Sequence, residues 1–109
     1  MTNQAFYLDK IKQFSDTIAE FVVNNPSIAK DTIMVFDRDE TPGFTAFYEK
    51  LVNLGKDHFH YTDIFELITP FNWDLLADLI WIRIIEKLHE TEKGKEILRK
   101  IYGEPTKEI

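Results

Sequence analysis

The sequence has 109 residues, no cysteine, and 19 acidic against 13 basic side chains, for a formal net charge of −6. Without cysteine it forms neither disulfides nor thiolate metal sites, which favours a reducing, cytoplasmic location, and the acidic balance argues against holding nucleic acid, which requires clustered Lys and Arg. No segment reaches the ~18 uninterrupted apolar residues of a membrane span, and the amino terminus does not resemble a signal peptide. We therefore expect one domain over residues 1–109, with 105–109 as a frayed tail, that binds neither membrane nor nucleic acid and uses no cofactor.

Helical periodicity dominates the first part of the chain. Between residues 5 and 24, apolar side chains recur at steps of three and four, which predicts an amphipathic helix. Asn25 and Pro26 suit the cap and first position of a second helix that runs to about Phe36. The β-branched cluster at 33–36 leaves a short strand open as an alternative.

The middle of the chain predicts two further helices. Thr41 followed by Pro42 suits the start of a helix with a stop at Gly55, and a loop follows over 56–61. A short helix is then expected over 62–68, before Pro70.

The last third of the chain predicts the longest helix, near residues 72–90, and a final helix that Thr91 caps and that ends after Tyr102. Short turns connect all of these segments. The predicted fold class is all-α: a compact antiparallel array of about five to six helices.

The last two predicted helices resemble a single helix-turn-helix unit of the tetratricopeptide type. The resemblance covers about residues 75–102 and depends on Trp81 and Gly94. It departs from the family where a small residue is expected in the second helix, because Ile97 and Leu98 lie there. The resemblance implies peptide or protein binding, and it assigns no site residues here.

The acidic segment that begins at Asp37 resembles the calcium-binding loop of an EF-hand. Such a loop needs Gly at its sixth position and Glu at its twelfth, whereas this chain has Pro42 and Tyr48 there. The sequence therefore favours acids that cap a turn over a calcium site.

A second candidate metal site surrounds two histidines. In an extended backbone His58 and His60 point the same way, and Asp63 or Glu66 would supply a third ligand for zinc or iron. The alternative is a polar loop that Phe59 and Tyr61 anchor on the core.

The chain has no glycine-rich phosphate loop and no Gly-flanked serine nucleophile, so a non-enzymatic role is favoured.

The predicted helix at 72–90 carries apolar residues on two sides. Trp73, Ala77, Ile80, Trp81, Ile84 and Leu88 form one broad face, and Leu75, Leu79 and Ile82 form a second stripe beside Asp78. The simpler interpretation is a central helix with both sides in the core. The functional alternative places Leu75, Leu79, Ile82, Trp81 and Asp78 in an interface, where aromatic residues concentrate binding energy.

Three functional hypotheses follow from these features. The first is a protein-interaction module, similar in size and charge to the acidic immunity proteins and antitoxins that block basic toxins. The second is a metal-binding protein or metal-dependent enzyme that uses His58, His60 and Glu66. The third is a helical homodimer. For the long helix we expect Leu79 to be largely buried and Trp81 to lie nearer a partner.

Overall fold

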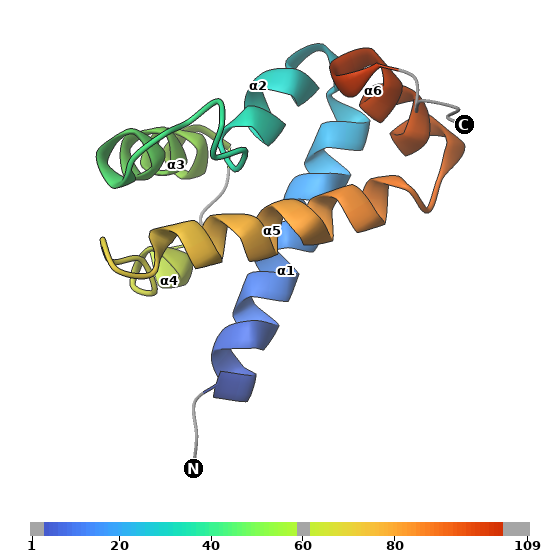
Figure 1. The fold of residues 1–109 in the computed structure, drawn as a ribbon. Coiled ribbons are helices and arrows are strands. Elements are labelled where there is room, and N and C mark those ends of the chain that lie inside the picture. The colour runs from blue at the N-terminus through green and yellow to red at the C-terminus, as the bar shows by residue number, and fades with distance from the viewer. Residues whose placement is uncertain (1–3, 59–61, 104–109) are drawn as a thin grey trace, which may run out of the picture.

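The computed structural model describes residues 4–58 and 62–103, and within these ranges all regular elements are helices (Figure 1). In chain order they are α1 (Gln4–Asn24), the 3-10 turn η1 (Pro26–Ile28), α2 (Ala29–Met34), α3 (Phe44–His58), α4 (Thr62–Phe65), α5 (Trp73–Leu88) and α6 (Glu92–Tyr102). The predicted all-α array is confirmed. None of the helices in these two ranges is long and apolar enough to span a membrane.

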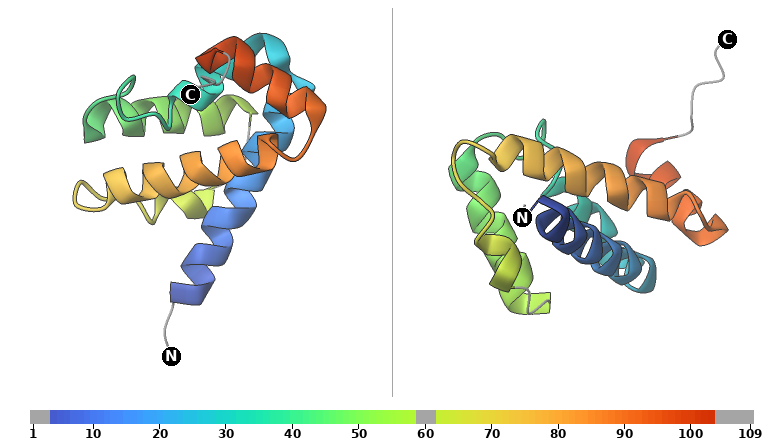
Figure 2. Two further views of the ribbon diagram at one scale, coloured as in Figure 1. Left: turned by 45° about the vertical axis from the view of Figure 1, so that its right-hand side comes forward. Right: turned by 90° about the horizontal axis from the view of Figure 1, so that it is seen from below.

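Helices α1 and α5 form the centre of the fold, with α5 lying across the middle of α1 (Figures 1 and 2). Helices α2 and α6 lie near the carboxyl end of α1, and α3 and α4 lie near the amino end of α5. The first turns of α1 extend past α5 (Figure 1). This arrangement gives α5 a covered inner side and leaves its other side without a covering helix in the described part of the chain.

The core receives apolar side chains from every α-helix. An aromatic chain runs through it: Phe36 lies edge-on to Phe14 and to Phe47, with ring centroids 6.3 and 6.1 Å apart, and Phe47 meets Trp73 at 5.8 Å. Such pairs stabilise a core beyond the area they bury. Further side chains at most 8% exposed include Ile18, Val22, Ile33, Leu51, Ile64, Leu76, Ala77, Ile80, Ile84, Leu88, Ile97 and Leu98.

The longest helix is not the one predicted. Helix α1 has 21 residues, whereas α5 has 16 and ends at Leu88. Helix α5 ends there because α6 starts at Glu92. Thr91 caps α6, as predicted: its Oγ1 accepts the backbone N–H of Gly94 at 3.0 Å. A Cβ on Gly94 would collide with the Leu88 carbonyl, so glycine permits this tight approach.

The predicted start of the second helix is wrong in detail. Asn25 makes no side-chain cap at the 3-10 turn; its Nδ2 donates to the Phe21 carbonyl at 2.9 Å and so completes the end of α1. Pro26 does occupy the first position of the turn. Residues 33–36 are not a strand, because Ile33 belongs to α2 and accepts the Phe36 N–H in a following turn.

Two predicted boundaries around α3 and one at α4 are also wrong. Thr41 does not cap α3: it is buried, and its hydroxyl donates to the Met34 carbonyl at 2.7 Å. The helix continues through Gly55 to His58, and a Cβ on Gly55 would lie 2.7 Å from Cζ of Phe65. Glycine is used there to seat the Phe65 ring rather than to stop the helix. Helix α4 ends at Phe65 rather than at residue 68.

Candidate interaction surface on helix α5

The structure separates the two apolar stripes of α5 by exposure. Four residues of the first stripe, Ala77, Ile80, Ile84 and Leu88, are completely buried, and Trp73 and Trp81 are partly buried. In the second stripe Leu75 is 61% and Ile82 is 49% exposed, while Leu79 is partly buried. The interpretation that both sides lie in the core is therefore wrong for Leu75 and Ile82.

We call Leu75, Leu79 and Ile82 the outer face of α5. Steps of four and three residues place these side chains on one side of a helix, opposite Ile80 and Ile84. No helix in the described residues covers Leu75 or Ile82, since both remain about half exposed or more. The outer face is thus an apolar stripe on the helix that organises the fold.

One flank of the outer face carries an arginine between two aspartates. Arg38 donates from Nε and Nη2 to the two carboxylate oxygens of Asp78, each at 2.9 Å, and its Nη1 lies 3.9 Å from Asp74. The pKa of Arg38 is raised, so Arg38 remains a cation. The largest cause is the hydrogen bond with Asp78, and the second largest is the negative charge of Asp78. Asp78, predicted as part of the interaction surface, is therefore already engaged within the chain.

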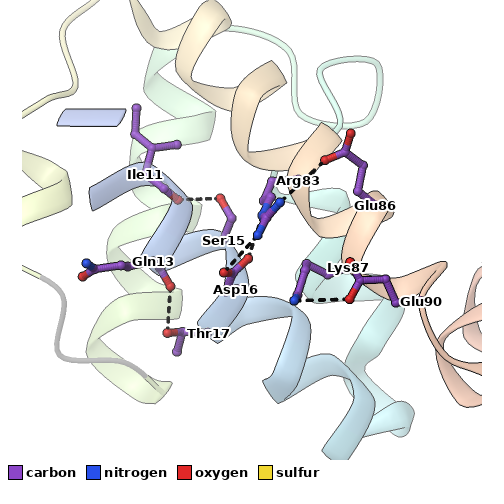
Figure 3. A network of polar contacts seen from close by, with 9 residues as sticks. All are labelled: Ile11, Gln13, Ser15, Asp16, Thr17, Arg83, Glu86, Lys87 and Glu90. Atoms are coloured by element: carbon purple, nitrogen blue, oxygen red, sulfur yellow. Dashed lines mark hydrogen bonds and ion pairs between the residues drawn. The ribbon is translucent and has the colours of Figure 1, made fainter. Parts of the chain in front are cut away.

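The other flank has the same composition and connects α5 to α1. Arg83 donates to the carboxylate of Asp16 at 2.8 and 3.3 Å, and its Nη1 lies 3.9 Å from Glu86 (Figure 3). The hydrogen bond with Asp16 is the largest cause of the raised pKa of Arg83. On each flank two carboxylates thus share one guanidinium, so acidic groups outnumber the arginine on both sides of the outer face.

Trp81 lies on the α6 side of α5. Its Nε1–H donates to the Tyr102 hydroxyl at 3.1 Å, and the two rings meet edge to face. Trp81 is partly buried, so it serves at least in part to dock α6 onto α5. Of the predicted surface residues, the structure groups Leu75, Leu79 and Ile82 and sets Trp81 apart.

An apolar groove adjoins the outer face at the amino-terminal end of α5. It has a volume of about 300 Å³ and is lined by Tyr7 and Ile11 of α1, by Glu66, Leu67, Thr69 and Asn72 of the α4–α5 connection, and by Leu75, Leu76 and Leu79 of α5. Phe6 and Leu8, which flank Tyr7 in the chain, and Phe71, which precedes Asn72, are exposed. The periodicity of the sequence did not single out these three residues. The available signals were apolar side chains off the periodic stripe of α1 and a phenylalanine placed in a turn.

The histidine hypothesis falls largely outside the described residues. His60 lies outside them, as do the side chains of His58 and Asp63, and Glu66 is an exposed residue that lines the apolar groove. Within the described residues no three His, Asp or Glu side chains gather as a metal site requires. In the segment with the EF-hand resemblance, Asp37 Oδ1 accepts the backbone N–H of Asp39 at 3.0 Å, as expected of an acid that caps a turn.

Comparison with protein-family models, with curated protein sequences and with solved structures finds no match to this chain. Its function must therefore be inferred from its own residues.

Proposed function

We propose that this chain is a non-enzymatic protein-interaction module that binds its partner through the outer face of α5. The observation that carries this proposal is the exposure of Leu75 and Ile82, at 61% and 49%, on the central helix of the fold. Single exposed apolar residues are common in soluble proteins. Apolar residues aligned on one helix face and continuous with an apolar groove form a patch of the kind that partners cover.

The flanks of the outer face indicate the chemistry of the partner. Arg38 is shared by Asp74 and Asp78, and Arg83 is shared by Asp16 and Glu86, so acidic groups predominate on both flanks. A helix or extended segment with an apolar stripe and a basic residue on either side complements this pattern. The net charge of −6 would also speed the approach of a basic partner.

An inhibitor of a basic cytoplasmic protein, comparable in size and charge to immunity proteins and antitoxins, fits this surface. Such a role needs a preformed apolar stripe and acidic flanks, and it needs no catalytic group. The ion pairs on both flanks hold α5 against α1 and against the loop that contains Arg38, so the stripe is presented by a supported helix. Preorganisation of this kind lowers the entropic cost of binding.

The proposal is tested by comparing the proteins that wild type and surface variants retain from cells of the source organism. Leu75→Glu combined with Ile82→Glu should lose the partner, because two buried charges would oppose the apolar contact. The matched control is Tyr48→Glu, which changes an exposed aromatic residue on α3. Each retained protein is then purified, and its affinity for wild type and for each variant is measured at low and high salt.

We expect a basic partner whose affinity falls at least about tenfold in the double variant, remains in Tyr48→Glu, and decreases as salt rises. Equal retention of all partners by wild type and the double variant would reject the outer face as the binding surface.

A further inference from the structure

A turn between α4 and α5 holds a phenylalanine in solvent. Phe71 is 94% exposed, more than any other large apolar side chain in the described residues. The turn around it is well ordered by hydrogen bonds: Asn72 Oδ1 accepts the Thr69 N–H at 2.8 Å, and Asn72 Nδ2 donates to the Leu67 carbonyl at 2.7 Å. The backbone N–H of Phe71 donates to Thr69 Oγ1 at 3.3 Å. These hydrogen bonds thus fix a turn that exposes an aromatic ring to water.

The residues that hold Phe71 also line the apolar groove. Thr69 and Asn72 contribute to its wall, next to Leu75 and Leu79, so the projecting ring and the groove are neighbours on the surface. The groove has a volume of about 300 Å³. An apolar cavity of about 150 Å³ accepts benzene, so this groove has room for a phenyl ring. Phe71 itself is too exposed to fill it.

A projecting ring beside a groove of matching chemistry is a self-complementary surface. An interface with two-fold symmetry requires both halves on the same face, because residue i of one copy meets residue j of the other and the reverse. We propose that two copies of this chain pair about a two-fold axis, each inserting Phe71 into the apolar groove of the other.

The apolar area near the groove is sufficient for such a pair. Tyr7 and Leu75, which both line the groove, are 42% and 61% exposed. Together with Phe71 these side chains present on the order of 400 Å² of apolar surface. A stable interface buries about 800 Å² per partner, of which somewhat more than half is apolar. The available surface therefore matches what a dimer of standard size covers.

Charge sets the conditions under which the pair forms. Among the described residues that line the groove, Glu66 alone is charged, so the contact these residues make is nearly uncharged. Each copy carries a net charge of −6, however, and two copies repel at long range. Added salt screens this repulsion, so dimer formation strengthens as salt rises. Binding of a basic partner has the opposite dependence.

The dimer would also affect partner binding. This consequence, unlike the dimer itself, rests on the proposed function. Leu75 and Leu79 belong both to the groove and to the outer face, whereas Ile82 belongs to the outer face alone. Self-association therefore covers part of the partner-binding surface, and the two events compete.

The test is the mass of the purified chain in solution, measured by sedimentation from micromolar to millimolar concentration at high salt. We expect wild type to pass from monomer to dimer and Phe71→Ala to weaken dimerisation about tenfold or more, as loss of a central aromatic anchor does. Because Phe71 is almost fully exposed, its replacement should leave the helical circular dichroism unchanged. Tyr48→Ala removes an exposed aromatic residue on α3 and should leave dimerisation unchanged.

The reciprocal contact is tested separately with engineered thiols, which are unambiguous because the chain has no cysteine. A mixture of Phe71→Cys and Leu75→Cys proteins should form the mixed disulfide in preference to either symmetric one. Wild type that stays monomeric throughout, or dimers that Phe71→Ala leaves intact, would overturn the proposal. Ile82→Glu should keep the dimer and Phe71→Ala should keep the basic partner, so failure of one proposal is distinguishable from failure of the other.

Discussion

Trp81 donates its indole N–H to the hydroxyl oxygen of Tyr102 over 3.1 Å, and the two rings meet edge to face with centroids 6.3 Å apart. This contact joins the middle of α5 to the last turn of α6. It also perturbs the phenol. Burial is the largest cause of a raised pKa for Tyr102; the hydrogen bond from Trp81 opposes it, and the negative charges of Asp37 and Glu40 add to it.

The raised pKa of Tyr102 predicts a loss of stability in alkali. The phenol of the unfolded chain ionises near pH 10, whereas the folded chain holds the proton to higher pH. The stabilising contribution is therefore complete below about pH 10 and is lost as pH rises through the folded pKa. Ultraviolet titration should show a phenol ionisation with a high midpoint that Tyr102→Phe removes. Tyr48→Phe, which changes an exposed ring, is the control and should leave that midpoint in place.

Helix formation was predictable along most of the chain because periodic apolar residues report burial on one side of a helix. The stripe of α1 is an example: Phe14, Ile18 and Val22 are all completely buried. Boundaries were less predictable, because the deciding contacts come from elsewhere in the chain. Gly55 resembles a helix stop, yet it lies inside α3 to make room for Phe65. The residues around Gly55 in the sequence do not show that the Phe65 ring packs against it.

Gly94 likewise depends on a contact outside its own helix, with Leu88 of α5, and this dependence can be measured as a change in stability. Alanine favours a helix over glycine by about 1 kcal/mol, so helix propensity alone predicts that Gly94→Ala stabilises α6. A Cβ at this position would instead collide with the backbone carbonyl of Leu88, which cannot rotate away. We expect Gly94→Ala to lower the free energy of unfolding by about 1 to 3 kcal/mol in denaturant titration.

The neighbouring Lys93 is exposed and provides the control for that measurement. Lys93→Ala should change the free energy of unfolding by no more than about 0.5 kcal/mol. A Gly94→Ala protein as stable as wild type would mean that α6 does not approach Leu88 as closely as described.

The candidate surface was only partly predictable. The spacing of Leu75, Leu79 and Ile82 identified a second apolar stripe, but periodicity does not reveal whether another helix covers it. Exposure depends on how α1 and α6 pack around α5, and the sequence does not specify that packing. The groove was beyond prediction for a related reason, because residues from α1, from the α4–α5 connection and from α5 form it together. For Phe71 the sequence offered only its place in a turn beside Pro70.

The ion pair between Asp16 and Arg83 predicts a modest, salt-sensitive coupling between α1 and α5. Their side chains are 34% and 30% exposed and lie 2.8 Å apart, so water and salt screen much of the attraction. In a double-mutant cycle with Asp16→Asn and Arg83→Gln, we expect a coupling energy of about 0.5 to 1 kcal/mol. The coupling should shrink as salt is added. A coupling of zero, or one that salt leaves unchanged, would contradict this geometry.

The two sides of α5 predict opposite responses to the same substitution. Ile84 is completely buried on the inner side, so Ile84→Ala should lower the free energy of unfolding by about 2 to 5 kcal/mol through lost burial and the cavity left behind. Ile82 is 49% exposed on the outer face, and Ile82→Ala should change it by no more than about 0.5 kcal/mol. Leu79, which is partly buried against the groove, should fall between them. Denaturant titration at low micromolar concentration measures all three variants on the monomer. Equal costs for Ile82→Ala and Ile84→Ala would mean that the outer face is covered within the chain, and that it is not free to bind a partner.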